Sequence, residues 1–129
     1  ENGGQMVEIA RECSKKMNSV VILTGTIDVV TNQEESFLVL NGHPMMKKVT
    51  GTGCQLSALT AAYVSVCPDK PLEAALAAVC AMGVAGEKAY GRMRPEDGSG
   101  SYRMYLMDGM YQLNGEELER YARYRKWQS

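Results

Sequence analysis

The stretch Val49–Ala58, with the sequence VTGTGCQLSA, constrains the fold of this chain more than any other. Two glycines flank Thr52, Cys54 follows, and an apolar pattern at helical spacing begins at Leu56. Glycine adopts positive φ angles and lets another group approach the backbone closely. A glycine turn that leads into a helix leaves the N–H groups of the first turn unpaired and directed at one place. The stretch therefore predicts a site for a phosphate or a developing negative charge.

Cys54 lies at the expected start of this helix, where the helix dipole favours a thiolate over a thiol. A structural thiol is the usual role of a cysteine, but a position beside glycines at a helix N-terminus favours a chemical role. The motif is not a Walker sequence, because no lysine follows the second glycine, and it lacks the third glycine of a dinucleotide fingerprint. We expect a phosphate to approach Gly53 closely, and a branched side chain there to force φ into a forbidden region.

Length and charge limit the class of protein. The 129 residues suffice for one domain with a core but not for two, so residues 1–129 are predicted to form a single α/β segment. The formal net charge of −1 argues against a nucleic-acid-binding surface and gives no reason for attraction to a membrane. No apolar run approaches the length needed to cross a bilayer. Because the first residue is Glu1 rather than methionine, we expect a processed, trimmed or split chain.

The four cysteines, Cys13, Cys54, Cys67 and Cys80, show no paired spacing such as C-x-x-C. Cys67 and Cys80 stand among alanines and valines, where a buried reduced thiol behaves as a small hydrophobic side chain. A disulfide is the weaker interpretation, and a zinc site is weaker still because His43 is the single histidine. We therefore expect no metal site in this chain, and a reducing, cytoplasmic location.

Hydrophobic periodicity predicts an α/β order for the first half. An amphipathic helix over 6–17 precedes a strand at 20–23, whose continuous apolar run is typical of a parallel strand buried on both faces. The turn Thr24–Thr26 ends this strand, and ligands bind at that end of the strands in open α/β sheets. The expected edge of the parallel sheet is a small antiparallel meander of three short strands at 28–31, 37–40 and 45–49.

The second half is predicted to be helical. The helix that follows the glycine turn should run to about residue 66 and stop before Pro68. An alanine-rich helix should then start near Pro71 and reach residue 90, with Pro71 in its first turn. A polar connection over 91–100 leads to two further helices, expected at 102–113 and 116–124. Asp28, at the start of the first meander strand, suits a turn-capping carboxylate better than a phosphate or metal site.

Three segments of the chain resemble hydroxyethylthiazole kinase, a family of the ribokinase-like superfamily. Ile22–Val30, with the sequence ILTGTIDVV, is similar to the T-G-x-x-D-x-V strand and turn of that family. Val49–Cys54, followed by a helix of small residues, resembles its glycine turn, and Gly98–Tyr102 resembles its G-x-G-S-aromatic segment before a late helix. The resemblance covers nearly the whole chain, but only the C-terminal half of a family member. It implies the C-terminal part of a ribokinase-like three-layer α/β/α fold.

The resemblance also implies an activity. Members of the family use ATP and Mg²⁺ to phosphorylate the hydroxyethyl group of 4-methyl-5-(2-hydroxyethyl)thiazole in thiamine salvage. By position, Thr24 resembles the threonine that contacts the nucleotide phosphates, and Gly51 resembles the glycine beside the substrate hydroxyl. Gly51, Thr52 and Gly53 would form the anion hole, and Cys54 occupies the position of the catalytic base. Many ribokinase-like enzymes have aspartate there, so cysteine narrows the choice to the vitamin-precursor kinases.

The resemblance further implies partners for this chain. The acidic residues on the magnesium side and most of the substrate pocket belong to the N-terminal half of a family member, and the family forms homotrimers with active sites at subunit interfaces. Two alternatives stay open. One is a hydroxymethylpyrimidine or pyridoxal kinase, which shares a G-T-G-C-like turn, and the other is a non-catalytic nucleotide- or anion-binding module. The short interval between Thr24 and Gly51, together with the T-G-x-x-D-x-V pattern, favours the thiazole kinase.

Overall fold

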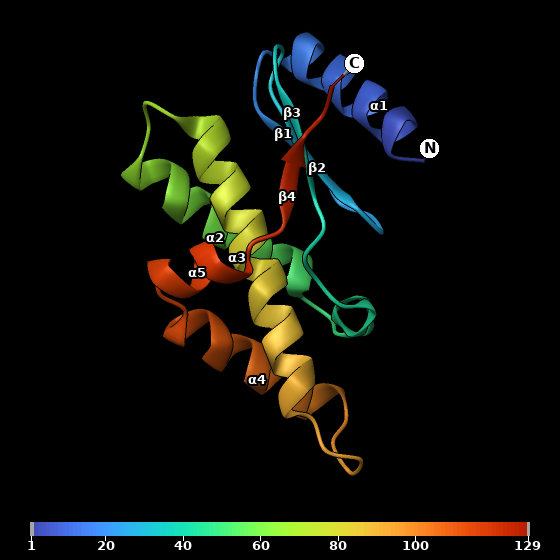
Figure 1. Cartoon of the computed structure of the whole chain (residues 1–129), viewed down its shortest axis with the longest axis vertical. Helices are drawn as coiled ribbons and strands as arrows, with labels where there is room; N and C mark the ends of the chain where they lie inside the picture. The colour runs from blue at the N-terminus through green and yellow to red at the C-terminus, as the bar shows by residue number, and fades with distance from the viewer. Residues whose placement is uncertain (1, 129) are drawn as a thin grey trace.

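The computed structural model describes residues 2–128, with a small sheet in the upper part of Figure 1 and most of the helices below it. Helix α1 (Asn2–Met17) covers one face of the sheet, and helix α3 (Pro71–Arg92) covers the other. Successive strand residues point to opposite faces, so Val29 packs towards α1 while its neighbour Val30 packs towards α3. This alternation builds two apolar cores, one on each side of the sheet. The expected three-layer α/β/α fold is confirmed.

The sheet consists of β1 (Val21–Leu23), β2 (Asp28–Thr31), β3 (Ser36–Val39) and β4 (Tyr124–Lys126), in the order β1-β2-β3-β4. Two strands of the expected meander are present as β2 and β3, but the parallel strands are not: every strand pair within residues 2–128 is antiparallel. The chain reverses directly after β1, because the turn at 24–27 is closed by a hydrogen bond and leads straight into β2. As an edge strand of this sheet, β1 is half-buried rather than buried on both faces.

The segment after β3 differs from the prediction. The strand expected at 45–49 is a 3₁₀ helix, η1 (Pro44–Lys48). Pro44 has no N–H group to donate to a strand ladder, whereas its fixed φ suits the first position of a helix. The preceding residue, His43, caps this helix, since its Nδ1 accepts a hydrogen bond from the backbone N–H of Met45 at 3.1 Å. The strand beside β3 is instead β4, which the sequence patterns did not predict.

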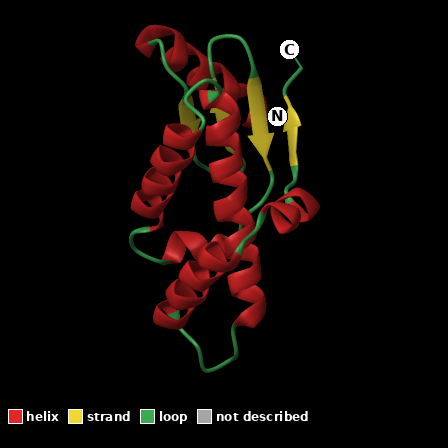
Figure 2. Cartoon of the chain, turned by 90° about the vertical axis from the view of Figure 1, so that its left-hand side faces the viewer, coloured by secondary structure: helices red, strands yellow, loops and turns green. Residues whose placement is uncertain are grey.

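The remaining helices are α2 (Thr52–Val66) and α4 (Ser99–Gln112), close to their predicted bounds, and α5 (Gly115–Tyr121), which ends before its predicted end because Tyr124 belongs to β4. Helix α3 is the central element: its first half packs on the sheet, and its second half packs against α4 (Figures 1 and 2). Tyr102 of α4 is fully buried at this contact, and its hydroxyl donates a hydrogen bond to the Gly86 carbonyl of α3 at 2.9 Å. Burial raises the pKa of Tyr102 to about 12. Helix α3 therefore connects the helical half of the molecule to the half that contains the sheet.

The four cysteines are free thiols. Cys80, on the sheet-facing side of α3, is buried as predicted, and this burial raises its pKa to about 11. The expectation that Cys67 is buried is wrong: it is the C-cap residue of α2 and lies at the surface. No helix within residues 2–128 is both long enough and apolar enough to span a membrane.

Candidate anion-binding site

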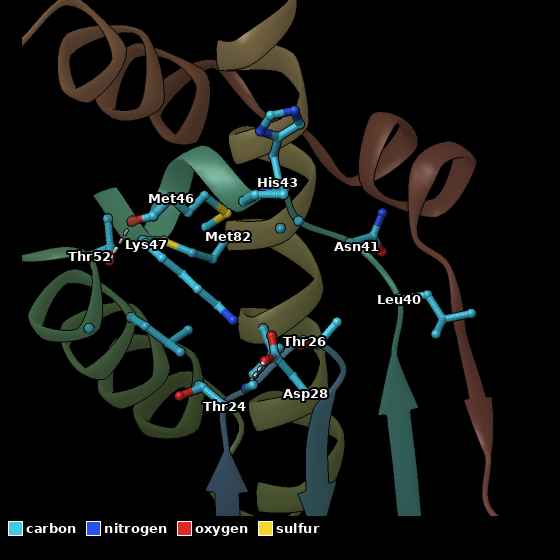
Figure 3. A pocket seen from close by; sticks show the side chains of 17 residues that line it. Thr24, Thr26, Asp28, Leu40, Asn41, His43, Met46, Lys47, Thr52 and Met82 are labelled. Atoms are coloured by element: carbon cyan, nitrogen blue, oxygen red, sulfur yellow. Dashed lines mark hydrogen bonds between the residues drawn. The ribbon is translucent and has the colours of Figure 1, made fainter. Parts of the chain in front are cut away.

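A cavity of about 720 Å³ lies beyond the end of β1, between the β1–β2 turn, η1 and the N-terminus of α2 (Figure 3). The turn contributes Thr24, the first residue of β2 contributes Asp28, and the start of α2 contributes Thr52 and Gly53. Further lining residues come from η1 and from α3. The two segments that the sequence singled out, the turn after the first strand and the glycine turn, therefore meet at one cavity although nearly thirty residues separate them.

The glycine turn owes its shape to Gly51, which is the N-cap residue of α2 and has φ +95° and ψ 0°. Residues other than glycine rarely adopt this conformation. The Gly51 carbonyl accepts the first helical hydrogen bond, from the N–H of Gln55 at 3.0 Å. On the outer side of the turn, Arg103 of α4 donates a hydrogen bond to the Thr50 carbonyl at 3.0 Å. Hydrogen bonds from two helices thus stabilise the turn: one comes from α2, which begins at the turn, and one comes from α4, far along the chain.

The second glycine of the motif differs from the first. Gly53 lies within the first turn of α2 with an ordinary helical φ, and a Cβ atom added there would have no neighbour within 4 Å. The expectation that a side chain at Gly53 forces φ into a forbidden region is therefore wrong; that requirement applies to Gly51. The residue between them, Thr52, joins α2 to η1, because its hydroxyl donates to the Met46 carbonyl at 3.3 Å.

Among residues 2–128, no side chain caps the N-terminus of α2. The N–H groups of its first turn therefore have no side-chain acceptor, which is the condition for binding an anion at a helix start. Among the predicted site residues, Thr24, Thr52 and Gly53 line the cavity. Gly51 and Cys54 are their neighbours in the chain but are not among the lining residues, and Cys54 is exposed in the first turn of α2.

Asp28 closes the turn that carries Thr24. Its Oδ1 accepts a hydrogen bond from the backbone N–H of Gly25 at 2.9 Å, which confirms the predicted role as a turn-capping carboxylate. Burial raises the pKa of Asp28, while this hydrogen bond and the positive charge of Lys47 act in the opposite direction. Within residues 2–128 there is no group of three His, Cys, Asp or Glu side chains that could hold a metal ion.

Two basic residues near the site are not predicted by the sequence patterns. Lys47 projects from η1 into the cavity (Figure 3), whereas the sequence pattern predicts a strand for its segment. Arg103 reaches the glycine turn from α4, 53 residues along the chain from Thr50. No spacing rule relates residues so far apart, and only the packing of α4 beside α3 brings Arg103 to this place.

Together these features define a class: a three-layer α/β/α protein with a ligand-sized cavity where β1 ends, beside an uncapped helix that begins at a glycine turn. The model of the hydroxyethylthiazole kinase family matches residues 1–116. The chain belongs to this family.

Individual relatives carry the same name. The chain is 48% identical over 122 residues to hydroxyethylthiazole kinase of Clostridium acetobutylicum, a match that covers 95% of this chain and 45% of that protein. It is 36% identical over 118 residues to the enzyme of Pyrococcus abyssi, covering 92% and 43% of the two chains. The solved structure of hydroxyethylthiazole kinase from Pyrococcus horikoshii OT3 superposes with a TM-score of 0.90 at 33% identity, over 98% of this chain and 48% of that one. The chain spans less than half the length of these relatives.

Proposed function

We propose that this chain is part of an enzyme that transfers a phosphoryl group from ATP to the hydroxyethyl group of 4-methyl-5-(2-hydroxyethyl)thiazole. The observation that carries the proposal is the meeting of the Thr24 turn and the uncapped N-terminus of α2 at one cavity, in a member of the hydroxyethylthiazole kinase family. Catalysis of phosphoryl transfer rests almost entirely on positioning and on stabilising charge. Backbone N–H groups at a helix start provide both.

In this proposal the first turn of α2 is the anion hole. Gly51 turns the chain so that the N–H groups of Thr52 and Gly53 are available to phosphoryl oxygens. Thr24 contacts the nucleotide phosphates from the β1–β2 turn, and the backbone at Gly51 lies beside the substrate hydroxyl. Cys54, exposed in the same turn of the helix, accepts the proton of that hydroxyl as general base.

The described residues do not fit a magnesium site. Mg²⁺ takes oxygen ligands in near-octahedral geometry, commonly one or two carboxylates with phosphates and water. Asp28 is the one carboxylate among the described residues that line the cavity, and its Oδ1 already accepts the Gly25 N–H. We therefore assign the acidic residues that would hold Mg²⁺ to the remainder of the enzyme.

The remainder of the enzyme, a segment that corresponds to the N-terminal half of the family, would pack beside β1 and α2. Within residues 2–128, β1 pairs with β2 alone and leaves its second edge open. Helix α2 carries no charged residue, although half of it faces solvent, and its exposed side consists largely of small side chains such as Ser57, Ala58, Ala61 and Ala62. Solvent-facing helices ordinarily carry charged side chains. An uncharged face and an open strand edge suit burial by further layers of the same fold.

We also propose a homotrimer, as the family resemblance implies. An exposed apolar face on α4 supports self-association: Met104, Met107 and Tyr111 follow one another at helical spacing, and Tyr111 is 91% exposed. Sedimentation equilibrium of the full-length protein that contains this chain measures its oligomeric state directly. A mass of three subunits is expected, and a monomer at micromolar concentration would contradict this part of the proposal.

The activity is tested with the same full-length protein in a coupled assay of ATP consumption. Three alcohols are compared at equal concentration: the thiazole alcohol, hydroxymethylpyrimidine and pyridoxal. The largest kcat/KM is expected for the thiazole alcohol. A larger value for either other alcohol refutes the substrate assignment, and tight ADP binding without turnover of any alcohol refutes the kinase and supports the non-catalytic binding module.

A further inference from the structure

Lys47 lines the cavity but has no role in the chemistry proposed above. It lies in η1, and its side chain extends across the cavity towards Thr26 of the β1–β2 turn and Asp28 of β2 (Figure 3). Among the described residues that line the cavity, it is the one lysine or arginine. The positive charge therefore enters the cavity from the side opposite the turn that carries Thr24.

The ammonium group of Lys47 has no partner within the described part of the chain. It takes part in none of the ion pairs there, and it donates none of the side-chain hydrogen bonds. Asp28 is the carboxylate that faces it, close enough for the charge of Lys47 to lower the pKa of that carboxyl, but the hydrogen bond of Asp28 goes to Gly25. All three donors of the ammonium remain available to a ligand.

The groups around Lys47 point to the chemistry of that ligand. The hydroxyl of Thr24 and the uncapped first turn of α2 line the same cavity, and each can bind a phosphoryl oxygen. A nucleotide di- or triphosphate carries several negative charges, and hydrogen bonds from a charged donor are roughly twice as strong as neutral ones. We propose that Lys47 binds the phosphate groups of the nucleotide and serves as the cationic part of the phosphate subsite. This inference rests on the proposed kinase function for the choice of ligand.

A purely structural role is the alternative. Lys47 would then hold η1 against the turn through its attraction to Asp28. Its loss would weaken the binding of every ligand in the cavity and would also lower the stability of the fold. The neighbouring Lys48 supplies the control, because it carries the same charge in the same 3₁₀ helix, is exposed as Lys47 is, and does not line the cavity. The two lysines therefore differ in position relative to the cavity but not in local secondary structure.

The experiment is calorimetric titration of the full-length protein with ATP, ADP and adenosine, using the parent, Lys47→Met, Lys47→Arg and Lys48→Met. Lys47→Met should weaken ATP and ADP binding by about tenfold to a hundredfold, as expected for loss of a charged hydrogen-bond donor, and leave adenosine binding unchanged. Lys47→Arg should recover most of the affinity, and Lys48→Met should stay within about twofold of the parent. Binding of ATP to Lys47→Met within about twofold of the parent overturns the inference. An equal loss for ATP and adenosine, with a lowered free energy of unfolding, overturns it in favour of the structural role.

Turnover of the thiazole alcohol is measured separately, so that the two proposals fail in different ways. A parent protein that binds ATP through Lys47 but phosphorylates none of the three alcohols refutes the proposed function and supports the phosphate subsite. A parent protein that phosphorylates the thiazole alcohol, with Lys47→Met showing the same KM for ATP, refutes the subsite alone. A parent protein that binds no ATP refutes both.

Discussion

The two glycines of the G-x-G turn should respond to alanine in opposite directions. Gly51 has φ +95° and ψ 0°, where an alanine is strained, whereas Gly53 has an ordinary helical φ. Space does not distinguish the two positions. A Cβ atom at Gly51 would lie 3.5 Å from the guanidinium of Arg103, an ordinary contact, and one at Gly53 would have no neighbour within 4 Å. The difference in stability therefore comes from the backbone alone.

The expected magnitudes follow from these conformations. A residue other than glycine in a sparsely populated backbone region costs about 1–3 kcal/mol, so Gly51→Ala should lower the free energy of unfolding by that amount. Glycine within a helix is less favourable than alanine by roughly 0.5–1 kcal/mol, so Gly53→Ala should raise the free energy of unfolding slightly. Gly51→Ala should also turn the first N–H groups of α2 away from the cavity and weaken phosphate binding.

Equilibrium unfolding of the full-length protein in urea measures both variants against the parent. The m-value should stay constant, so that a shift of the midpoint reports stability. Gly51→Asn provides a further comparison, because asparagine tolerates positive φ better than alanine and should lie between alanine and glycine. The reasoning is refuted if Gly51→Ala matches the parent, or if the alanine variants at Gly51 and Gly53 shift the midpoint in the same direction.

Three further predictions concern single side chains. Cys54→Ala should lower kcat by about 10²–10⁴-fold in the full-length enzyme, with Cys54→Asp retaining more activity; a kcat equal to that of the parent would show that Cys54 is not the base. Burial raises the pKa of Cys80 from 9.0 to about 11, so its contribution to stability is present below pH 9 and is lost as the pH rises towards 11. At about 1.4 kcal/mol per pKa unit, this loss is about 2–3 kcal/mol, and Cys80→Ala should remove that part of the pH dependence of unfolding. Tyr102→Phe should lower the free energy of unfolding by about 0.5–1.5 kcal/mol, because the buried hydroxyl then no longer donates to Gly86; an unchanged urea midpoint would contradict this.

Local patterns predicted most of the fold correctly. The helices α1 to α4 follow from apolar spacing and from the prolines between them, and strands β1 to β3 follow from short apolar runs separated by turn residues. The error about β1 has a physical origin, since a run such as Val20–Leu23 is apolar whether its neighbours are parallel or antiparallel. The missed strand β4 carries exposed charged side chains, and its pairing with β3 joins residues about 90 positions apart. Such long-range pairing leaves no trace in a local window.

The candidate site was predictable where one segment contains the whole signal. The start of α2 can be predicted from consecutive residues, and the threonine after β1 follows from the rule that ligands bind at strand ends. The chain does not reveal which of the two glycines needs a positive φ, because both stand beside Thr52 and either could begin the helix. Arg103 could not be found at all, because its contact with the turn depends on how α4 packs against α3.

The position of Lys47 was missed for a different reason, and here the sequence did contain the necessary signal. In any strand through 45–49, Lys47 and Lys48 would point to opposite faces, so neither face would be apolar. A half-buried strand with a charge on each face is unfavourable. His43 and Pro44, by contrast, form a cap and a first residue for a short helix, and both have these roles in η1. The tight 3₁₀ turn then directs only one of the two lysines into the cavity. Recognising the helix start at His43 would therefore have corrected the secondary structure of this segment.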